Sequence, residues 1–310
     1  MQNQVFAAAL ESAWSRESKK ATFSEVQQFR ALMKSFASLG APFKVEEFHG
    51  MKHQVVFNGK GSWGRPSARC EISDLLIVAY RSKPYFQARA TLLQAKKSNE
   101  KHSNLCDDWP NSIPLTSFGA NLEQWDLLSR RPSVLPYPPF DCHPEILSGA
   151  ILPSVGSIGV FHKRKGKVYD FFYMSADHSA PLSSPKRKFA KLQTLPGKRL
   201  RHLHGFDECT FACCLPTFAS SLYNLEIGTP IEPNNTVNEK DARYRNNFRG
   251  WLRTVLSSHL EMTNNDSALA RELLEYLDSE YEAEFMAQPP KLVLINSDDG
   301  EFNDQRQSDS

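Results

Sequence analysis

The sequence predicts a mixed α/β fold, in which a central mixed sheet is flanked by helices and a helical region follows at the C-terminal end. Apolar residues recur at helical spacing over 2–16, after Ser24 and over 122–130. Short apolar runs typical of strands occupy 54–58, 71–80, 87–96, 157–162 and 168–174. The order helix, strand, strand, strand, helix, strand agrees with an α/β or α+β layout with a central mixed sheet.

The second helix has recognisable signals at both ends. Thr22 and Glu25 fit a capping box, and Ser24 is the alternative N-cap residue. Gly40 and Pro42 end the helix, because glycine favours the left-handed C-cap conformation and proline cannot continue a helix.

The chain divides into four predicted parts. Residues 1–180 contain the N-terminal helices and the strands, and we expect them to form the core. Residues 181–206 are predicted to be a basic loop. Residues 289–310 are polar and acidic, and we expect a flexible tail there. Residues 207–288 are predicted to pack on or beside the core as helices at 207–224, 239–258 and 266–286.

The composition is that of a soluble globular protein. Of the 310 residues, 40% are hydrophobic and the formal net charge is +2. No apolar run approaches the roughly 18 residues that cross a membrane. The first residues lack the basic segment of a signal peptide, so we expect a cytoplasmic protein with no membrane partner.

The six cysteines do not form a CxxC framework, so we expect reduced thiols rather than disulfides. A zinc site at His202, His204, Cys209 and Cys213 is disfavoured. The segment around these cysteines has the pattern of an apolar helix, in which free cysteine packs as a small hydrophobic residue.

The most informative segment is 71–96, in which an acid opens one apolar run and Gln-Ala-Lys closes a second. A turn near Pro84 would place Asp74 opposite Gln94. Gln94 and Lys96 are two residues apart and therefore share one face of their strand. A carboxylate, an amide oxygen and an ammonium would then meet at one end of a hairpin, which suits a hard divalent cation.

This pattern resembles the PD-(D/E)xK nuclease superfamily, in the variant with Gln at the acidic second position that occurs in some bacterial defence nucleases. Asp74 matches the metal-binding Asp, Gln94 takes the (D/E) position, and Lys96 matches the Lys. Ser73 stands where the motif has its Pro. The resemblance covers 45–175 and implies a restriction-endonuclease-like α-β-β-β-α-β core.

The resemblance also implies Mg²⁺ or Mn²⁺ as the cofactor. Asp74, the side-chain oxygen of Gln94 and the main-chain carbonyl of Ala95 would bind the ion. Lys96 would orient or deprotonate the attacking water and offset charge on the phosphate. The neutral amide of Gln94 leaves less negative charge at the metal than the usual acid does.

A further acid often completes the site in this superfamily, and Glu71 is the nearest one in sequence. Glu71 lies an odd number of residues from Asp74, so a regular strand would place the two on opposite faces unless a bulge intervened. By the same alternation, Lys97 should face away from Lys96. The other candidate acids are Glu11, Glu25, Glu46 and Glu47.

A basic segment over 186–201 contains seven Lys or Arg and no acid. Such a segment can bind nucleic acid, because neutralising phosphates releases counterions. The alternative is a solvated basic loop, which is the commoner fate of a charge run. The candidate nucleic-acid-binding residues are Lys186, Arg187, Lys188, Lys191, Lys198, Arg199 and Arg201.

The predicted function is a metal-dependent DNA endonuclease, and family analogy indicates a restriction or anti-phage effector with a protein partner. The alternative is a catalytically silent nuclease-like scaffold that binds nucleic acid or a partner protein. In a third interpretation the hairpin is only structural, and Asp74 and Lys96 would point apart. The apolar stripe that includes Leu273 and Leu277 is typical of a core, with a homodimer surface as the alternative.

Overall fold

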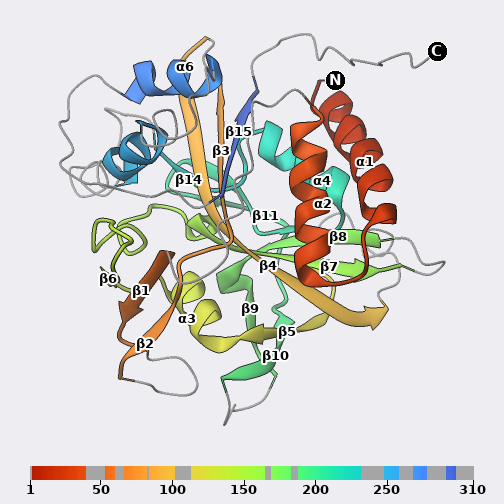
Figure 1. Cartoon of the computed structure of the whole chain (residues 1–310), viewed down its shortest axis with the longest axis horizontal. Helices are drawn as coiled ribbons and strands as arrows, with labels where there is room; N and C mark the ends of the chain where they lie inside the picture. The colour runs from red at the N-terminus through yellow and green to blue at the C-terminus, as the bar shows by residue number, and fades with distance from the viewer. Residues whose placement is uncertain are drawn as a thin grey trace.

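A seven-stranded mixed sheet forms the centre of the computed structural model, with helices on both of its faces (Figure 1). The strands lie in the order β13-β8-β7-β4-β3-β15, and β14 pairs with β4. The mixed α/β class with a central mixed sheet is therefore confirmed. The strands are β3 (Leu75–Arg81), β4 (Gln87–Lys101), β7 (Gly156–Lys163), β8 (Tyr169–Ser175), β13 (Phe211–Ala212), β14 (Thr229–Pro230) and β15 (Lys291–Asn296).

The structure describes residues 2–39, 53–59, 66–81, 84–101, 113–164, 169–182, 188–231, 248–257, 268–277 and 291–297. Their α-helices are α1 (Gln2–Lys20), α2 (Glu25–Ala37), α3 (Leu122–Arg130), α4 (Leu215–Tyr223), α6 (Ala268–Leu277) and a helix over 248–257. Two short 3₁₀ helices are η2 (Pro153–Val155) and η3 (Ala176–His178). No helix in these ranges is long and apolar enough to cross a membrane.

The connections at the centre of the sheet combine a hairpin with a helical crossover. β3 and β4 are antiparallel neighbours. The chain then passes through β5 (Ser117–Asn121) and α3 before it enters β7, which lies parallel to β4. A crossover is required here because parallel neighbours cannot be joined by a tight turn. β7 and β8 are again antiparallel.

Both faces of β3 are buried, which explains its uninterrupted apolar sequence. On one face, Leu75 and Ile77 pack in a cluster with α1, α2 and α4. On the other face, Leu76 and Val78 pack with α3, α6 and the helix over 248–257. The sheet is therefore the middle of three layers.

Three smaller sheets surround the central one. The first has the order β2-β1-β6, the second has the order β5-β10-β9, and the third is the β11–β12 hairpin. Their further strands are β1 (Gln54–Phe57), β2 (Ala68–Glu71), β6 (Val134–Pro136), β9 (Ser179–Pro181), β10 (Phe189–Thr194), β11 (Leu200–Leu203) and β12 (Phe206–Cys209).

Ser24 caps α2, since its side-chain oxygen accepts a hydrogen bond from the backbone N–H of Gln27 at 3.2 Å. This decides between the two capping arrangements that the sequence allows. The sequence also predicts α3 over its observed bounds, and the side chain of Asn121 caps that helix by accepting from Glu123 N.

The prediction of a basic loop over 181–206 is wrong, because β10 and β11 lie within it. Along β10, the buried residues Leu192 and Thr194 alternate with the exposed residues Phe189 and Lys191. The strand therefore has one face in the core, and its one basic residue, Lys191, lies on the other face.

The predicted helix over 207–224 begins only at Leu215, since β12 and β13 occupy the preceding residues. On α6, the apolar stripe buries Leu273 and Leu277 in the core, as its spacing indicates. Four cysteines of the described chain are free and buried. Cys213 is disulfide-bonded, so the expectation of reduced thiols fails at that position.

The expectation of a flexible tail over 289–310 is wrong for β15. This strand pairs in parallel with β3, from Lys291 opposite Leu75 to Asn296 opposite Tyr80. Its four apolar residues are buried because helices cover both faces of the sheet. Residues 298–310 lie outside the described ranges.

We predict that Val293→Asp strongly destabilises the protein. Val293 is fully buried at the centre of β15, and an unpaired carboxylate there should lower the free energy of unfolding by about 3 kcal/mol or more. Thermal denaturation measures the effect. Leu135→Asp, at a residue that is 65% exposed, is the control and should change stability by about 0.5 kcal/mol or less. Equal melting temperatures for the two variants would contradict the inclusion of β15 in the sheet.

Candidate active site

The register of the β3–β4 hairpin brings Asp74 to Gln94. Leu75 lies opposite Leu93, and the pairing continues without a shift to Arg81 opposite Gln87. One residue before β3, the backbone N–H of Asp74 donates to the carbonyl of Leu93 at 3.1 Å. The predicted pairing of Asp74 with Gln94 is therefore confirmed.

Two donors from β4 hold the carboxylate of Asp74. Its Oδ2 accepts from the backbone N–H of Ala95 at 2.7 Å and also from Nε2 of Gln94. β3 starts only after Asp74, so its backbone does not extend to the N–H of Ala95. The side chain of Asp74 accepts that hydrogen bond in place of a backbone carbonyl. The contacts fix the position of the carboxylate relative to the Gln-Ala-Lys sequence.

Gln94 is 2% exposed, and its Oε1 has no hydrogen-bond partner among the described residues. A buried polar atom left in this way costs about 1–3 kcal/mol of stability. Such an acceptor is available to a ligand that donates a hydrogen bond or carries positive charge. The side-chain amide of Gln94 carries both an oxygen and an NH₂ group. Rotation of the amide by 180° would exchange Oε1 with Nε2, which now donates to Asp74.

Asp74, Gln94 and Lys96 line one cavity of about 640 Å³. They therefore do not point apart, as they would if the hairpin had only a structural role. The walls come from α2, the junction of β2 with β3, β4, β5 with the start of α3, and β10. The other lining residues are Glu25, Glu71, Gly119, Ala120, Asn121, Gln124, Phe189, Ala190 and Lys191.

Glu71 lines this cavity together with Asp74, although strand alternation predicts opposite faces. The alternation argument fails because the two residues belong to different sheets. Glu71 ends β2, and Asp74 is the last residue of the bent segment 72–74 that leads the chain into β3. Burial raises the pKa of Glu71, the charge of Asp74 raises it further, and the ammonium of Lys96 opposes both effects.

Lys96 reaches the cavity from the same face of β4 as Gln94, as its spacing predicts. Its Nζ lies 3.8 Å from a carboxylate oxygen of Glu25, the first residue of α2. Lys97 faces the other way, where its Nζ donates to the carbonyl of Phe23 at 3.2 Å. Glu11 does not line the cavity, and Glu46 and Glu47 lie outside the described ranges.

Two oxygen atoms at the end of the hairpin are of the kind that Mg²⁺ or Mn²⁺ prefers: a carboxylate oxygen of Asp74 and the amide oxygen of Gln94, which has no partner among the described residues. Ala95, whose carbonyl is the third predicted ligand, is 2% exposed and is not among the residues that line the cavity. Within the described ranges, no group of three or more His, Cys, Asp or Glu side chains is arranged to hold a metal ion. A cation at this position would therefore depend on neutral oxygens and water as well as on Asp74.

The predicted nucleic-acid-binding residues have different environments. Lys191 lines the cavity and pairs with Glu100 at 2.7 Å, and both side chains are largely exposed. Lys188 lies 2.5 Å from the buried carboxylate of Glu123. Lys198 is exposed. Lys186 and Arg187 lie outside the described ranges.

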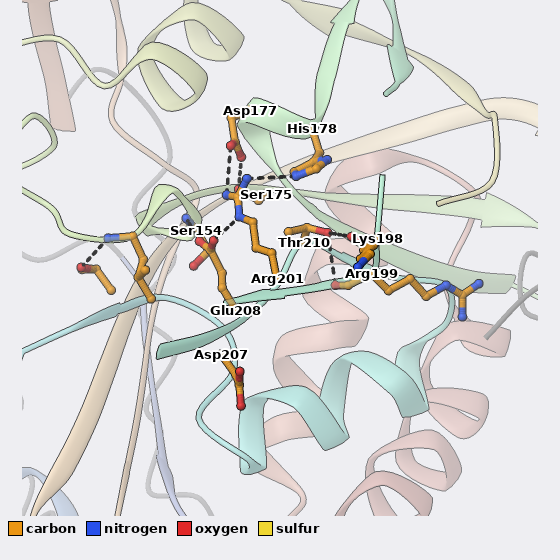
Figure 2. A network of polar contacts seen from close by, with 12 residues as sticks. Ser154, Ser175, Asp177, His178, Lys198, Arg199, Arg201, Asp207, Glu208 and Thr210 are labelled. Carbon is orange, nitrogen blue, oxygen red and sulfur yellow. Dashed lines mark hydrogen bonds and ion pairs between the residues drawn. The ribbon is translucent and has the colours of Figure 1, made fainter. Parts of the chain in front are cut away.

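Arg201 belongs to an internal polar network, which Figure 2 shows between β11, β12 and η3. Its guanidinium pairs with the fully buried Glu208 and, at 3.0 Å, with Asp177. The second oxygen of Glu208 accepts from the backbone N–H of Ser154 at 2.6 Å. These contacts hold the β11–β12 hairpin against the core. Because the guanidinium is engaged within the protein, these contacts do not support binding of nucleic acid by Arg201, and contact with a phosphate stays a prediction.

Arg199 is also directed inward. One of its guanidinium nitrogens lies 3.4 Å from the sulfur of Cys213, and the group lies over the ring of Phe211. Burial lowers the pKa of Arg199 from its ordinary value. The hydroxyl of Thr210 fixes the adjacent backbone by donating to the carbonyl of Lys198 at 2.6 Å (Figure 2). Contact of Arg199 with a phosphate stays a prediction.

Sequence reasoning missed two groups of residues that line the cavity. Gly119 and Asn121 come from β5, and Phe189 comes from β10. The only local signal for β10 was its alternation of apolar and polar residues, which the high charge of the segment concealed.

Comparison with protein-family models, with curated proteins and with solved structures gave no match to this chain.

We predict that Glu71→Gln stabilises the protein more at pH 7 than at pH 4 in metal-free buffer. The folded-state pKa of Glu71 lies above the ordinary value of 4.5, so the folded chain holds this proton more tightly than the unfolded chain. Protonated Glu71 therefore stabilises the folded state fully below pH 4.5, and this stabilisation is lost as the pH rises through the folded-state pKa. Thermal denaturation at both pH values tests this, and an equal gain at both would contradict it.

Proposed function

We propose that this chain is a metal-dependent nuclease that hydrolyses phosphodiester bonds in DNA. The observation that carries this proposal is the convergence of Asp74, Gln94 and Lys96 on one cavity at the end of the β3–β4 hairpin. These are the residues in which the sequence resembles the PD-(D/E)xK superfamily. The chain order also supports the proposal, since a helix, an antiparallel hairpin, a crossover helix and a parallel strand occur in this order, with strands of the smaller sheets between them.

Asp74, Oε1 of Gln94 and the carbonyl of Ala95 are the groups that would hold Mg²⁺ or Mn²⁺. When bound, such an ion would polarise the scissile phosphodiester and stabilise the charge that develops on it. Gln94 can serve in this way because its buried oxygen has no partner among the described residues. The two hydrogen bonds to Asp74 keep its carboxylate beside that oxygen.

Lys96 supplies the positively charged side chain that would stabilise the charge developing on the phosphate. Its side chain is only 10% exposed, and its ion pair with Glu25 is long, at 3.8 Å. We propose that its ammonium orients the attacking water and offsets the charge of the phosphate. Glu71 is the additional acid of this site, and its raised pKa means that it can hold a proton at a pH where an ordinary glutamate has lost it.

The biological setting we propose is restriction or anti-phage defence in the cytoplasm, where a partner protein would control the activity. This part rests on analogy with the family. A second function is favoured by one observation, namely that Asp74 is already held by two donors and has no group of acidic ligands around it in the described chain. That function is a silent nuclease-like scaffold that binds nucleic acid or a protein.

We predict that the purified chain nicks supercoiled plasmid in Mg²⁺ or Mn²⁺ and that EDTA abolishes the nicking. Lys96→Ala should lower the rate about a hundredfold or more, because it removes charge stabilisation at the reacting phosphate. Lys97→Ala is the matched control, since Lys97 is adjacent in sequence but contacts Phe23 on the opposite face. Equal losses in the two variants would argue against a role for Lys96 in the chemistry.

We predict that Asp74→Ala abolishes binding of Mn²⁺, as measured by calorimetry without DNA. The carboxylate is the only charged group among the proposed ligands, so its removal leaves two neutral oxygens. Metal binding by the wild-type chain without nicking would indicate an effector that lacks its partner. A wild-type chain that neither binds metal nor cuts DNA would favour the silent scaffold.

A further inference from the structure

The β5-β10-β9 sheet presents one face to the core and the other to solvent. On β10, Leu192 and Thr194 are buried, whereas Phe189 and Lys191 are exposed. Phe189 is 70% exposed, which is high for an aromatic residue in a strand. Exposure of so large an apolar surface to water is unfavourable, so stacking of a flat apolar group on the ring would be favourable.

Phe189 lines the same cavity as Asp74, Gln94 and Lys96. The ring is therefore part of the candidate site rather than an isolated apolar residue on a distant surface. The pairing of β10 with β5 sets Phe189 opposite Asn121, the N-cap residue of α3, and so fixes the backbone position from which the ring extends. An aromatic platform thus lies beside the groups that would act on a phosphate.

Lys191 supplies a cation two residues along the same exposed face. Its pairing with Glu100 joins side chains that are 62% and 42% exposed, and such surface pairs contribute little to stability. The ammonium can therefore exchange that carboxylate for a phosphate at low cost. Gly119 lies directly across from Lys191, and a Cβ atom there would meet nothing within 4 Å. The wall of the cavity is consequently open beside the lysine.

We propose that Phe189 stacks on an unpaired base of the bound DNA and that Lys191 contacts a neighbouring phosphate. The site would then accept single-stranded or locally unpaired DNA. In a duplex, both faces of a base are covered by its neighbours, so the ring of Phe189 could stack only on a base that has left the helix. This inference rests on the proposed function, whose catalytic groups line the same cavity.

The test is fluorescence anisotropy with a labelled oligonucleotide in EDTA, as a single strand and as a duplex of the same sequence. The wild-type chain should bind the single strand more tightly. Phe189→Ala should weaken that binding roughly ten- to a hundredfold, as loss of one base–aromatic stack does. Phe189→Trp should retain it, and the fluorescence of the new indole should fall when the strand binds. Tyr85→Ala removes another aromatic residue, 80% exposed and outside the cavity, and should have no effect.

Gly119→Leu provides a second variant that does not depend on the aromatic ring. Because Gly119 is exposed and a Cβ atom at this position meets nothing within 4 Å, the variant should fold with an unchanged melting temperature. It should nevertheless weaken single-strand binding at least several-fold, since the new side chain would occupy the path beside Lys191. Full binding by this variant would overturn the proposed path of the strand.

Three results would overturn the stacking proposal: equal affinity of the wild-type chain for single strand and duplex, no binding of either form, or unchanged binding by Phe189→Ala. The proposed nuclease activity fails separately. Strand binding that depends on Phe189 without any cleavage in Mn²⁺ would leave the stacking site standing and reject the nuclease. Cleavage by the wild-type chain with no effect of Phe189→Ala on binding would reject the stacking site and support the nuclease.

Discussion

The register of the β3–β4 hairpin is the constraint on which the candidate site depends. A shift by one residue would turn every side chain of β4 to the other face and would exchange Lys96 for Lys97 in the cavity. The hydrogen bonds of Asp74 mark this register at the end of the strand, because its N–H donates to the carbonyl of Leu93 and its carboxylate accepts from the N–H of Ala95. The pairing of the hairpin therefore determines which charges reach the site.

The sequence is sufficient where the signals are local. The apolar runs of the hairpin and the polar break between them predict which residues face one another, so the meeting of Asp74, Gln94 and Lys96 follows from the sequence alone. The same holds for α2 and α3, whose capping residues mark their first turns. In each case the information lies within a few residues of the element that it describes.

The remaining features depend on contacts between distant segments. Glu71 joins Asp74 because the chain changes sheets between them, and strand periodicity carries no information about such a change. Phe189 reaches the cavity through pairing of β10 with β5, and the charge of its segment favoured a loop. The short run of β15 is ordered by its pairing with β3 and by burial on both faces of the sheet, and its local sequence shows neither of these contacts.

The position of β15 has a consequence for the order in which the molecule is completed. The strand lies beside β3, yet most of the chain separates the two in sequence. Closing so long a loop is entropically costly, and contacts between distant segments slow folding. During synthesis, the edge of β3 stays open until β15 has left the ribosome. The central sheet is therefore completed late in synthesis, after every residue that lines the cavity has already been made.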